Sequence, residues 1–74
     1  MINLLGTTNA GHIIIQQKEI GKNEGVVLAY KMLGNINKIQ FVTWLVNTEL
    51  REYFWGHYYF DDLRVALEDF EKRN

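Results

Sequence analysis

The chain has 74 residues, of which 47% are hydrophobic and 23% charged, and its formal net charge is -1. This length supports one hydrophobic core, so we expect a single domain over residues 1–74. The absence of cysteine and proline excludes a disulfide scaffold and a thiolate zinc site. A net charge this close to zero also removes the polybasic signature of proteins that bind nucleic acid or anionic membranes.

The first sixty residues alternate apolar runs with short polar connections. Glycine and asparagine, which tolerate positive φ, gather at residues 6–11, 21–25 and 34–37. The strand candidates between and after these turns are residues 2–5, 12–20, 26–33, 39–46 and 52–60, of which 2–5 is the weakest. Such short connections favour antiparallel neighbours in a meander, because parallel crossovers need a dozen or more residues.

The last segment changes to a helical period. Its apolar residues recur at spacings of three and four: Leu63, Ala66, Leu67 and Phe70. We expect Asp61 to be the N-cap, with Phe60 packing on Val65 as a hydrophobic staple. The sequence therefore predicts an α+β domain, an antiparallel β-meander of three to five strands with one C-terminal α-helix packed on one face.

Eight of the ten aromatic residues lie between Phe41 and Phe60. Side chains alternate along a strand, so residues 52–60 are expected to divide by parity. One set is Phe54, Gly56, Tyr58 and Phe60; the other is Tyr53, Trp55, His57 and Tyr59. We expect the helix to pack on Phe54, Tyr58 and Phe41.

The second face of the sheet then lacks a cover, because one short helix shelters only one face. The predicted interaction surface on it is Tyr53, Trp55, His57, Tyr59 and, in one register, Trp44. If the hairpin pairs even with even positions, Trp44 falls beside Phe54; if it pairs even with odd, Trp44 joins Tyr53 or Trp55. The turn at residues 47–51 does not decide between these registers. A second copy of the chain is the simplest cover, which predicts a homodimer.

The aromatic residues are compatible with two further roles. They could form a bulky core with edge packing. Alternatively, sheet aromatics stack bases in several single-stranded nucleic-acid-binding folds, but lysine and arginine frame those surfaces. The charged residues near the hairpin are Lys38, Arg51 and Arg64 against Glu49, Glu52, Asp61 and Asp62. This balance argues against nucleic acid.

Catalytic and metal-binding motifs are missing from the sequence. His12 and His57 are the only histidines, and no ligand spacing typical of zinc surrounds them. A nucleophile elbow, a P-loop and a dinucleotide-binding glycine motif are all absent. The pair Asp61-Asp62 is accounted for by helix capping. We therefore expect no enzyme, no metal and no cofactor.

A longer pattern covers about residues 39–73. Its parts are Phe41-Val42-Thr43-Trp44, Trp55-Gly56-His57-Tyr58, and a helix with Asp62, Ala66, Asp69-Phe70 and Arg73. This pattern resembles small uncharacterised proteins of low-GC Gram-positive bacteria and their phages or plasmids, in which YVTW is followed by WGHYF and a short acidic helix. The additional aromatic Tyr59 departs from that pattern. The resemblance implies a setting in which small proteins bind and inhibit host or defence proteins.

These observations lead to one leading expectation and two alternatives. The N-terminus lacks the basic region of a secretory signal, and no apolar run approaches the roughly 20 residues of a membrane span. We therefore expect a cytoplasmic protein without a membrane partner. The predicted function is a small non-enzymatic protein-interaction module, homodimeric through an aromatic sheet face. The alternatives are a phage or mobile-element inhibitor of a host or defence protein, and a single-stranded nucleic-acid-binding sheet.

Overall fold

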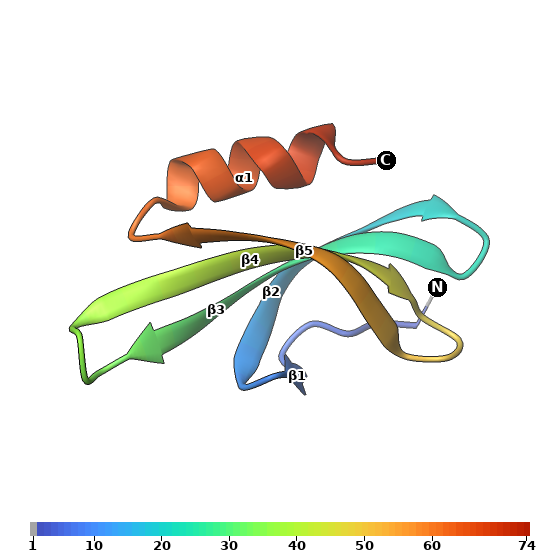
Figure 1. Ribbon diagram of the computed structural model, residues 1–74. Coiled ribbons are helices and arrows are strands. Elements are labelled where there is room, and N and C mark those ends of the chain that lie inside the picture. The colour runs from blue at the N-terminus through green and yellow to red at the C-terminus, as the bar shows by residue number, and fades with distance from the viewer. Residues whose placement is uncertain (1) are drawn as a thin grey trace.

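The computed structural model describes residues 2–74 as one antiparallel sheet followed by one helix (Figure 1). The elements are β1 (Thr8–Asn9), β2 (His12–Gly21), β3 (Glu24–Leu33), β4 (Lys38–Asn47), β5 (Glu52–Phe60) and α1 (Leu63–Lys72). The strands lie in the order β1-β2-β3-β4-β5, and each neighbouring pair is antiparallel. The predicted α+β class and the meander are confirmed.

Left-handed residues close the turns of the meander. Gly6 and Gly11 have φ of 81° and 78°, and Asn23 and Asn37 have φ of 58° and 53° in the next two turns. Glycine and asparagine adopt this conformation at the lowest cost, so the turn segments predicted from composition are confirmed. The turn between β4 and β5 uses Arg51, with φ of 54°, and its composition carries no such signal.

Residues 2–5 form no strand, and the segment is instead held against β2 by hydrogen bonds. The Gly6 N–H donates to the Ile14 carbonyl at 2.8 Å, and the Ile14 N–H donates to the Thr7 carbonyl at 3.0 Å. The Leu4 N–H donates to the Gln17 side-chain carbonyl at 2.7 Å. These bonds hold the segment against the sheet and place the Leu4 side chain in the core, where it is fully buried.

Two hydrophobic clusters lie on opposite sides of the central strands. The N-terminal cluster is Leu4, Ile14, Val27, Ala29, Val42, Trp44 and Val46, with Tyr53 packed against it. The helix cluster is Val26, Leu28, Phe41, Ala66 and Phe70. Successive residues such as Val26 and Val27 fall in different clusters, because side chains alternate along a strand. Figure 1 shows α1 on one side of the twisted sheet and the N-terminal segment on the other.

The expectation that one face of the sheet lacks a cover is wrong. Trp44, assigned to that uncovered face, is only 4% exposed, and Leu4 of the same chain closes the cluster around it. The accessible surface of the chain is 4641 Å², close to the roughly 4,700 Å² expected of a folded monomer of this mass. The chain therefore buries both of its clusters without a second copy.

The helix begins one residue later than predicted. Its N-cap is Asp62, whose Oδ1 accepts a hydrogen bond from the Val65 N–H at 3.1 Å. Asp61 instead accepts from the Ile39 N–H at 2.8 Å and pairs with Lys38 at 3.6 Å, so it ends the β4–β5 ladder. Within residues 2–74 no helix is long and apolar enough to cross a membrane.

The contacts of α1 also differ from the predicted set. Ala66 and Phe70 meet Phe41 as expected, together with Val26 and Leu28 of β3. Leu63 is exposed, and Leu67 lies half-buried at the margin of the cluster. The predicted partners Phe54 and Tyr58 are both largely exposed. A bulge in β5 places Tyr58 on the opposite face, beside Trp44, whereas Phe54 keeps the helix side opposite Leu45 but remains exposed there.

Candidate functional site

A bulge interrupts β5 in the middle of its aromatic run. Thr43 pairs with His57 and Leu45 pairs with Phe54, so two residues, Trp55 and Gly56, oppose Trp44 alone. An extra residue of this kind reverses the parity of the strand beyond it. Trp55 has φ of 55°, a left-handed conformation that is rare for a bulky side chain.

The bulge redistributes the predicted aromatic surface between the two faces. Tyr53 packs against the N-terminal cluster, whereas Tyr59 packs against the helix cluster. His57 is hydrogen-bonded to α1, on the same side as Tyr59. The prediction that these residues share one face with Trp55 is therefore wrong, because strict alternation fails at the bulge.

Both registers considered from the sequence occur in the same hairpin. Val42 pairs with Tyr58, an even-to-even match, while Val46 pairs with Tyr53, an even-to-odd match on the other side of the bulge. Trp44 consequently lies beside both tyrosines, with ring centroids 5.6 Å from Tyr53 and 6.4 Å from Tyr58.

Gly56 makes room for this packing. A Cβ atom added at Gly56 would lie 2.8 Å from the Trp44 Nε1 and 2.8 Å from the Tyr58 Cε1. Real Cβ contacts are essentially never that short, and both neighbours are rigid rings. The second position of the bulge is thus restricted to glycine by the two aromatic side chains that flank it.

His12 is a packed core residue on the N-terminal side. Its ring meets Trp44 edge to face at 5.4 Å, and the residue is 4% exposed. Its Nδ1 lies 3.0 Å from the Ala10 carbonyl, which can only accept, so Nδ1 carries a proton. Its Nε2 lies 2.8 Å from the side-chain amide of Gln40. His12 and His57 therefore stand on opposite sides of the sheet and cannot share a ligand.

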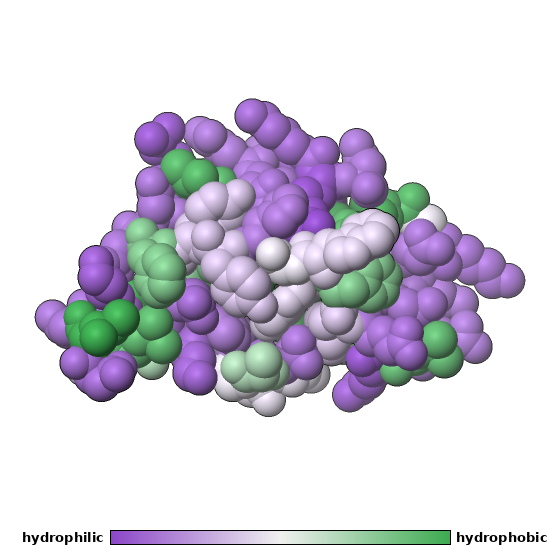
Figure 2. All heavy atoms as spheres, in the orientation of Figure 1, coloured by the Kyte–Doolittle hydropathy of each residue, from purple (hydrophilic) through white to green (hydrophobic). Residues whose placement is uncertain are grey.

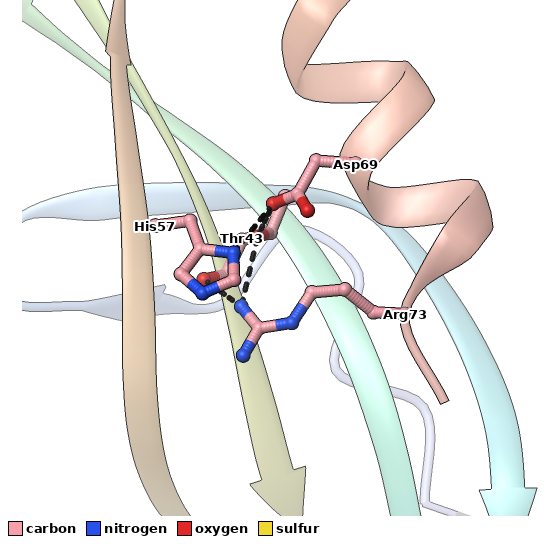
Figure 3. Close-up of polar contacts among 4 residues, drawn as sticks. All are labelled: Thr43, His57, Asp69 and Arg73. Carbon is pink, nitrogen blue, oxygen red and sulfur yellow. Dashed lines mark hydrogen bonds and ion pairs between the residues drawn. The ribbon is translucent and has the colours of Figure 1, made fainter.

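A polar network, here called the helix clamp, joins α1 to β4 and β5; it consists of Thr43, His57, Asp69 and Arg73 (Figure 3). The Asp69 Oδ2 accepts from the Thr43 hydroxyl at 2.6 Å and lies 2.9 Å from the His57 Nδ1. The Arg73 Nη1 donates to the Thr43 carbonyl at 2.9 Å and to its hydroxyl at 3.0 Å. The hydroxyl of the buried Thr43 is thereby engaged both as donor and as acceptor.

The clamp fixes the charge state of its carboxylate. Burial alone would raise the pKa of Asp69, but hydrogen bonds from Thr43 and His57 together hold it below its usual range. Burial raises the pKa of the Tyr59 hydroxyl, and the negative charge of Asp69 raises it further. At neutral pH the network therefore contains an ionised Asp69 beside a neutral Tyr59.

The chemistry of the clamp favours a structural role. A carboxylate that orients a histidine is typical of general-base sites, in which the imidazole then accepts a proton from a hydroxyl or water. Here the Thr43 hydroxyl donates to Asp69 instead of to His57. Within residues 2–74 no group of three histidine, aspartate or glutamate side chains could hold a metal ion. The clamp thus connects α1 to the sheet without a poised nucleophile.

The largest exposed aromatic residues gather along β5, the last strand of the sheet. Trp55, Tyr58 and Phe60 are 72%, 51% and 50% exposed, and Phe54 contacts the Trp55 ring at 5.6 Å. We call these four residues the β5 edge. Figure 2 shows pale and green residues across the middle of the view, where β5 crosses the front of the sheet in Figure 1.

The β5 edge overlaps the predicted surface only in part. Trp55 is the most exposed of the predicted residues, and His57 is exposed although it is held by the clamp. Tyr53 and Tyr59 are half-buried, and Trp44 lies in the core. Sequence reasoning missed Phe54, Tyr58 and Phe60 as surface residues. Their position in the last strand of a meander was the available signal, because such a strand lies at the edge.

No family model, curated protein or solved structure matches this chain. Two features of the chain bear on its function, the helix clamp and the β5 edge. The clamp uses its polar groups internally, whereas the β5 edge presents apolar area to solvent.

Proposed function

We propose that this chain is a small non-enzymatic protein-interaction module whose contact surface is the β5 edge. The exposure of Trp55 carries the proposal. Tryptophan and tyrosine dominate the binding energy of protein interfaces, because they bury a large area at a low cost in side-chain entropy. Trp55 also holds a left-handed backbone that costs about 1 kcal/mol, and packing within the chain does not offset that cost at 72% exposure.

We further infer that α1 packs on one face of the sheet and acts as its brace. Ala66 and Phe70 supply the apolar contacts, and Asp69 and Arg73 supply the clamp. These contacts reach β4 directly, and they reach β5 through Tyr59 and His57. The outer edge of β5 is thus presented by a fixed scaffold, and binding there costs little reorganisation.

The surroundings of the β5 edge favour a protein partner over nucleic acid. Arg51 is accompanied by Glu52 at one end of β5, and Lys38 is paired with Asp61 at the other. Proteins that bind single strands surround their aromatic residues with several basic groups, whereas the basic residues at the ends of this strand are matched in number by acidic ones. Inhibition of a host or defence protein, as the resemblance implies, would be an alternative use of the same edge in the cytoplasm.

The test compares two exposed apolar positions. Trp55→Ser removes the centre of the β5 edge, whereas Met32→Ser removes a similarly exposed side chain at the end of β3. We expect self-association and protein cross-linking to be lost in Trp55→Ser and retained in Met32→Ser, with both variants folded by circular dichroism. A chain whose protein contacts are unchanged by Trp55→Ser would overturn the proposal. So would binding of a labelled single-stranded oligonucleotide that requires Trp55 and weakens steeply with salt.

A further inference from the structure

We propose that the β5 edge pairs with the β5 edge of a second copy, antiparallel about a two-fold axis, so that two sheets join into one of ten strands. This inference rests on the proposed function, since it names the partner of that surface. The opposite edge is covered in part, because residues 6–9 bond to residues 12–14 of β2 and the Leu4 N–H bonds to the Gln17 side chain, and the rest of that strand carries Lys18. In contrast, β5 has only β4 as a neighbour and contains no lysine or proline, the residues that block edge pairing.

The backbone groups available for pairing follow from the β4–β5 ladder. The Asp61 N–H donates to the Ile39 carbonyl, so the backbone groups of Asp61 point toward β4. In an antiparallel ladder the backbone groups of every second residue point the same way. The N–H and C=O groups of Tyr58 and Phe60 therefore point away from β4 and toward the open edge.

Beyond the bulge, the outward positions shift by one. Leu45 and Ile39 are an even number of residues apart in β4, so the backbone N–H and C=O groups of both point toward β5. The backbone groups of Phe54, the partner of Leu45, therefore point toward β4, and those of the neighbouring Tyr53 point outward. The outward positions are therefore Tyr53 on one side of the bulge, and Tyr58 and Phe60 on the other. The backbone groups of a regular strand alternate with a period of two. Such a strand therefore cannot bond both to Tyr53 and to the outward positions on the other side of the bulge.

A second copy of β5 does match it, because it brings an identical bulge. When the two strands run antiparallel with their bulges opposed, the extra residue on one side is balanced by the extra residue on the other. This condition selects one register, in which Trp55 lies opposite the partner's Gly56, Tyr53 opposite the partner's Tyr58 and Phe54 opposite the partner's His57. The self-complementary spacing is the reason for assigning the edge to a second copy.

The side chains agree with this register. Tyr53 packs against the N-terminal cluster, and the Tyr58 ring meets Trp44 of that same cluster. Phe54 pairs with Leu45, which borders the helix cluster, and His57 is hydrogen-bonded to Asp69 of α1 on that same side. Residues that meet across the two-fold axis thus belong to the same face of the joined sheet. Both kinds of pair are aromatic, and such cross-strand pairs each contribute up to about 1 kcal/mol.

The charges at the two ends of β5 are also complementary. In the selected register Arg51 lies opposite the partner's Phe60, one residue from the partner's Asp61. The two-fold axis repeats this contact. The formal net charge of -1 per copy adds little repulsion between copies. Because each monomer already buries its clusters, we expect a dimer that dissociates on dilution without unfolding.

The first experiment uses the absence of native cysteine, which leaves no competing thiol. Chains carrying Tyr53→Cys are mixed with chains carrying Tyr58→Cys under mild oxidation. In the selected register the two Cα atoms lie about 5.5 Å apart, within reach of a disulfide. We expect the mixed disulfide to exceed the one formed between Tyr53→Cys and Phe60→Cys chains, which represents a register shifted by two residues.

The second experiment compares two substitutions at an outward position. Tyr58→Pro removes an N–H that β4 does not use, whereas Tyr58→Val removes the same ring and keeps the N–H. Because the two-fold axis applies each change twice, we expect Tyr58→Pro to dimerise at least roughly tenfold more weakly than Tyr58→Val. Analytical ultracentrifugation measures the difference, and circular dichroism at matched concentration verifies that both variants are folded.

The outcomes separate this inference from the proposed function. A dominant disulfide between positions 53 and 60 would overturn the register. A wild-type chain that stays monomeric at millimolar concentration, or equal dimerisation of Tyr58→Pro and Tyr58→Val, would overturn pairing with a second copy. If Trp55→Ser nevertheless abolished cross-linking to another protein, the interaction module would stand and only its partner would change.

Discussion

The two sides of the sheet are closed in different ways. The N-terminal cluster contains seven buried apolar side chains, and Trp44 within it makes edge-to-face contacts with His12 and two tyrosines. The helix cluster contains five, and α1 adds the polar clamp to them. Close packing therefore dominates one side, and hydrogen bonds to charged groups carry a larger share on the other. Steric changes should act most strongly on the first side, and changes of charge on the second.

β5 contributes to both sides because of its bulge. Tyr53 reaches the N-terminal cluster, and Tyr59 reaches the helix cluster after the reversal of parity at Trp55 and Gly56. The edge strand is thereby anchored from two sides while its outer groups stay open. This arrangement reconciles a monomer of ordinary surface area with an exposed row of aromatic residues.

The largest effect is expected from a single methyl group on the closely packed side. Gly56→Ala places a Cβ 2.8 Å from both the Trp44 Nε1 and the Tyr58 Cε1. We expect the free energy of unfolding to fall by about 2–3 kcal/mol, because the rigid rings must shift. Urea denaturation followed by tryptophan fluorescence measures the loss.

Gly34→Ala is the matched control. A Cβ at Gly34, in the turn between β3 and β4, meets nothing within 4 Å, and its φ lies outside the left-handed region. We expect its stability to stay within about 0.5 kcal/mol of the wild type. Equal losses in the two variants would contradict the view that Trp44 and Tyr58 pack closely on Gly56.

The second effect tests the polar side. Asp69→Asn keeps the shape of the side chain but removes the charge that accepts from Thr43 and His57. We expect a loss of about 1–2 kcal/mol at neutral pH. Because the folded-state pKa of Asp69 is depressed, its contribution is complete above its unfolded value and is lost as the pH falls through the folded value. The difference between wild type and Asp69→Asn should therefore shrink below about pH 4.

Glu68→Gln supplies the comparison for that charge. Glu68 pairs with Arg64 at 3.2 Å one turn along α1, where both side chains are largely exposed. Such surface pairs contribute little, so we expect a loss below about 0.5 kcal/mol. If Asp69→Asn behaved like Glu68→Gln at every pH, the clamp would not hold the helix to the sheet.

The periodic elements were predictable from the sequence because local patterning decides them. The runs that became β2 to β5 alternate or carry β-branched residues between turn glycines, and the stripe from Leu63 to Phe70 has helical spacing. The helix cap was misplaced by one residue because Asp61 and Asp62 are adjacent and chemically alike. Only the hydrogen bond between Asp61 and Ile39 separates their roles.

The bulge and the N-terminal cover were not predictable in the same way. Glycine or asparagine normally marks a left-handed backbone, whereas here Trp55 adopts it and Gly56 follows one position later. Leu4 lies in a short apolar run that suggests a strand, yet it is held by the side chain of Gln17 in β2. Both features arise from contacts between distant segments. The candidate surface was misassigned for the same reason, since one inserted residue decides which side chains share a face.

The smallest effect, at Trp55, distinguishes the edge from both packed sides. Trp55→Ala and Trp55→Gly remove the same ring and its contact with Phe54. Only glycine adopts the left-handed conformation at φ of 55° without steric strain. We therefore expect the glycine variant to be more stable than the alanine variant by about 1 kcal/mol, although glycine ordinarily weakens a strand.

Self-association should show no such difference. Both variants lose the exposed ring, so both should remain monomeric at concentrations where the wild type dimerises. A glycine variant that is less stable than the alanine variant would mean that the bulge is not strained at Trp55. A glycine variant that is more stable and still dimerises would mean that the tryptophan is not retained for association. Greater stability with loss of dimerisation is the outcome expected of a residue whose conformational cost is offset at the interface and not within the monomer.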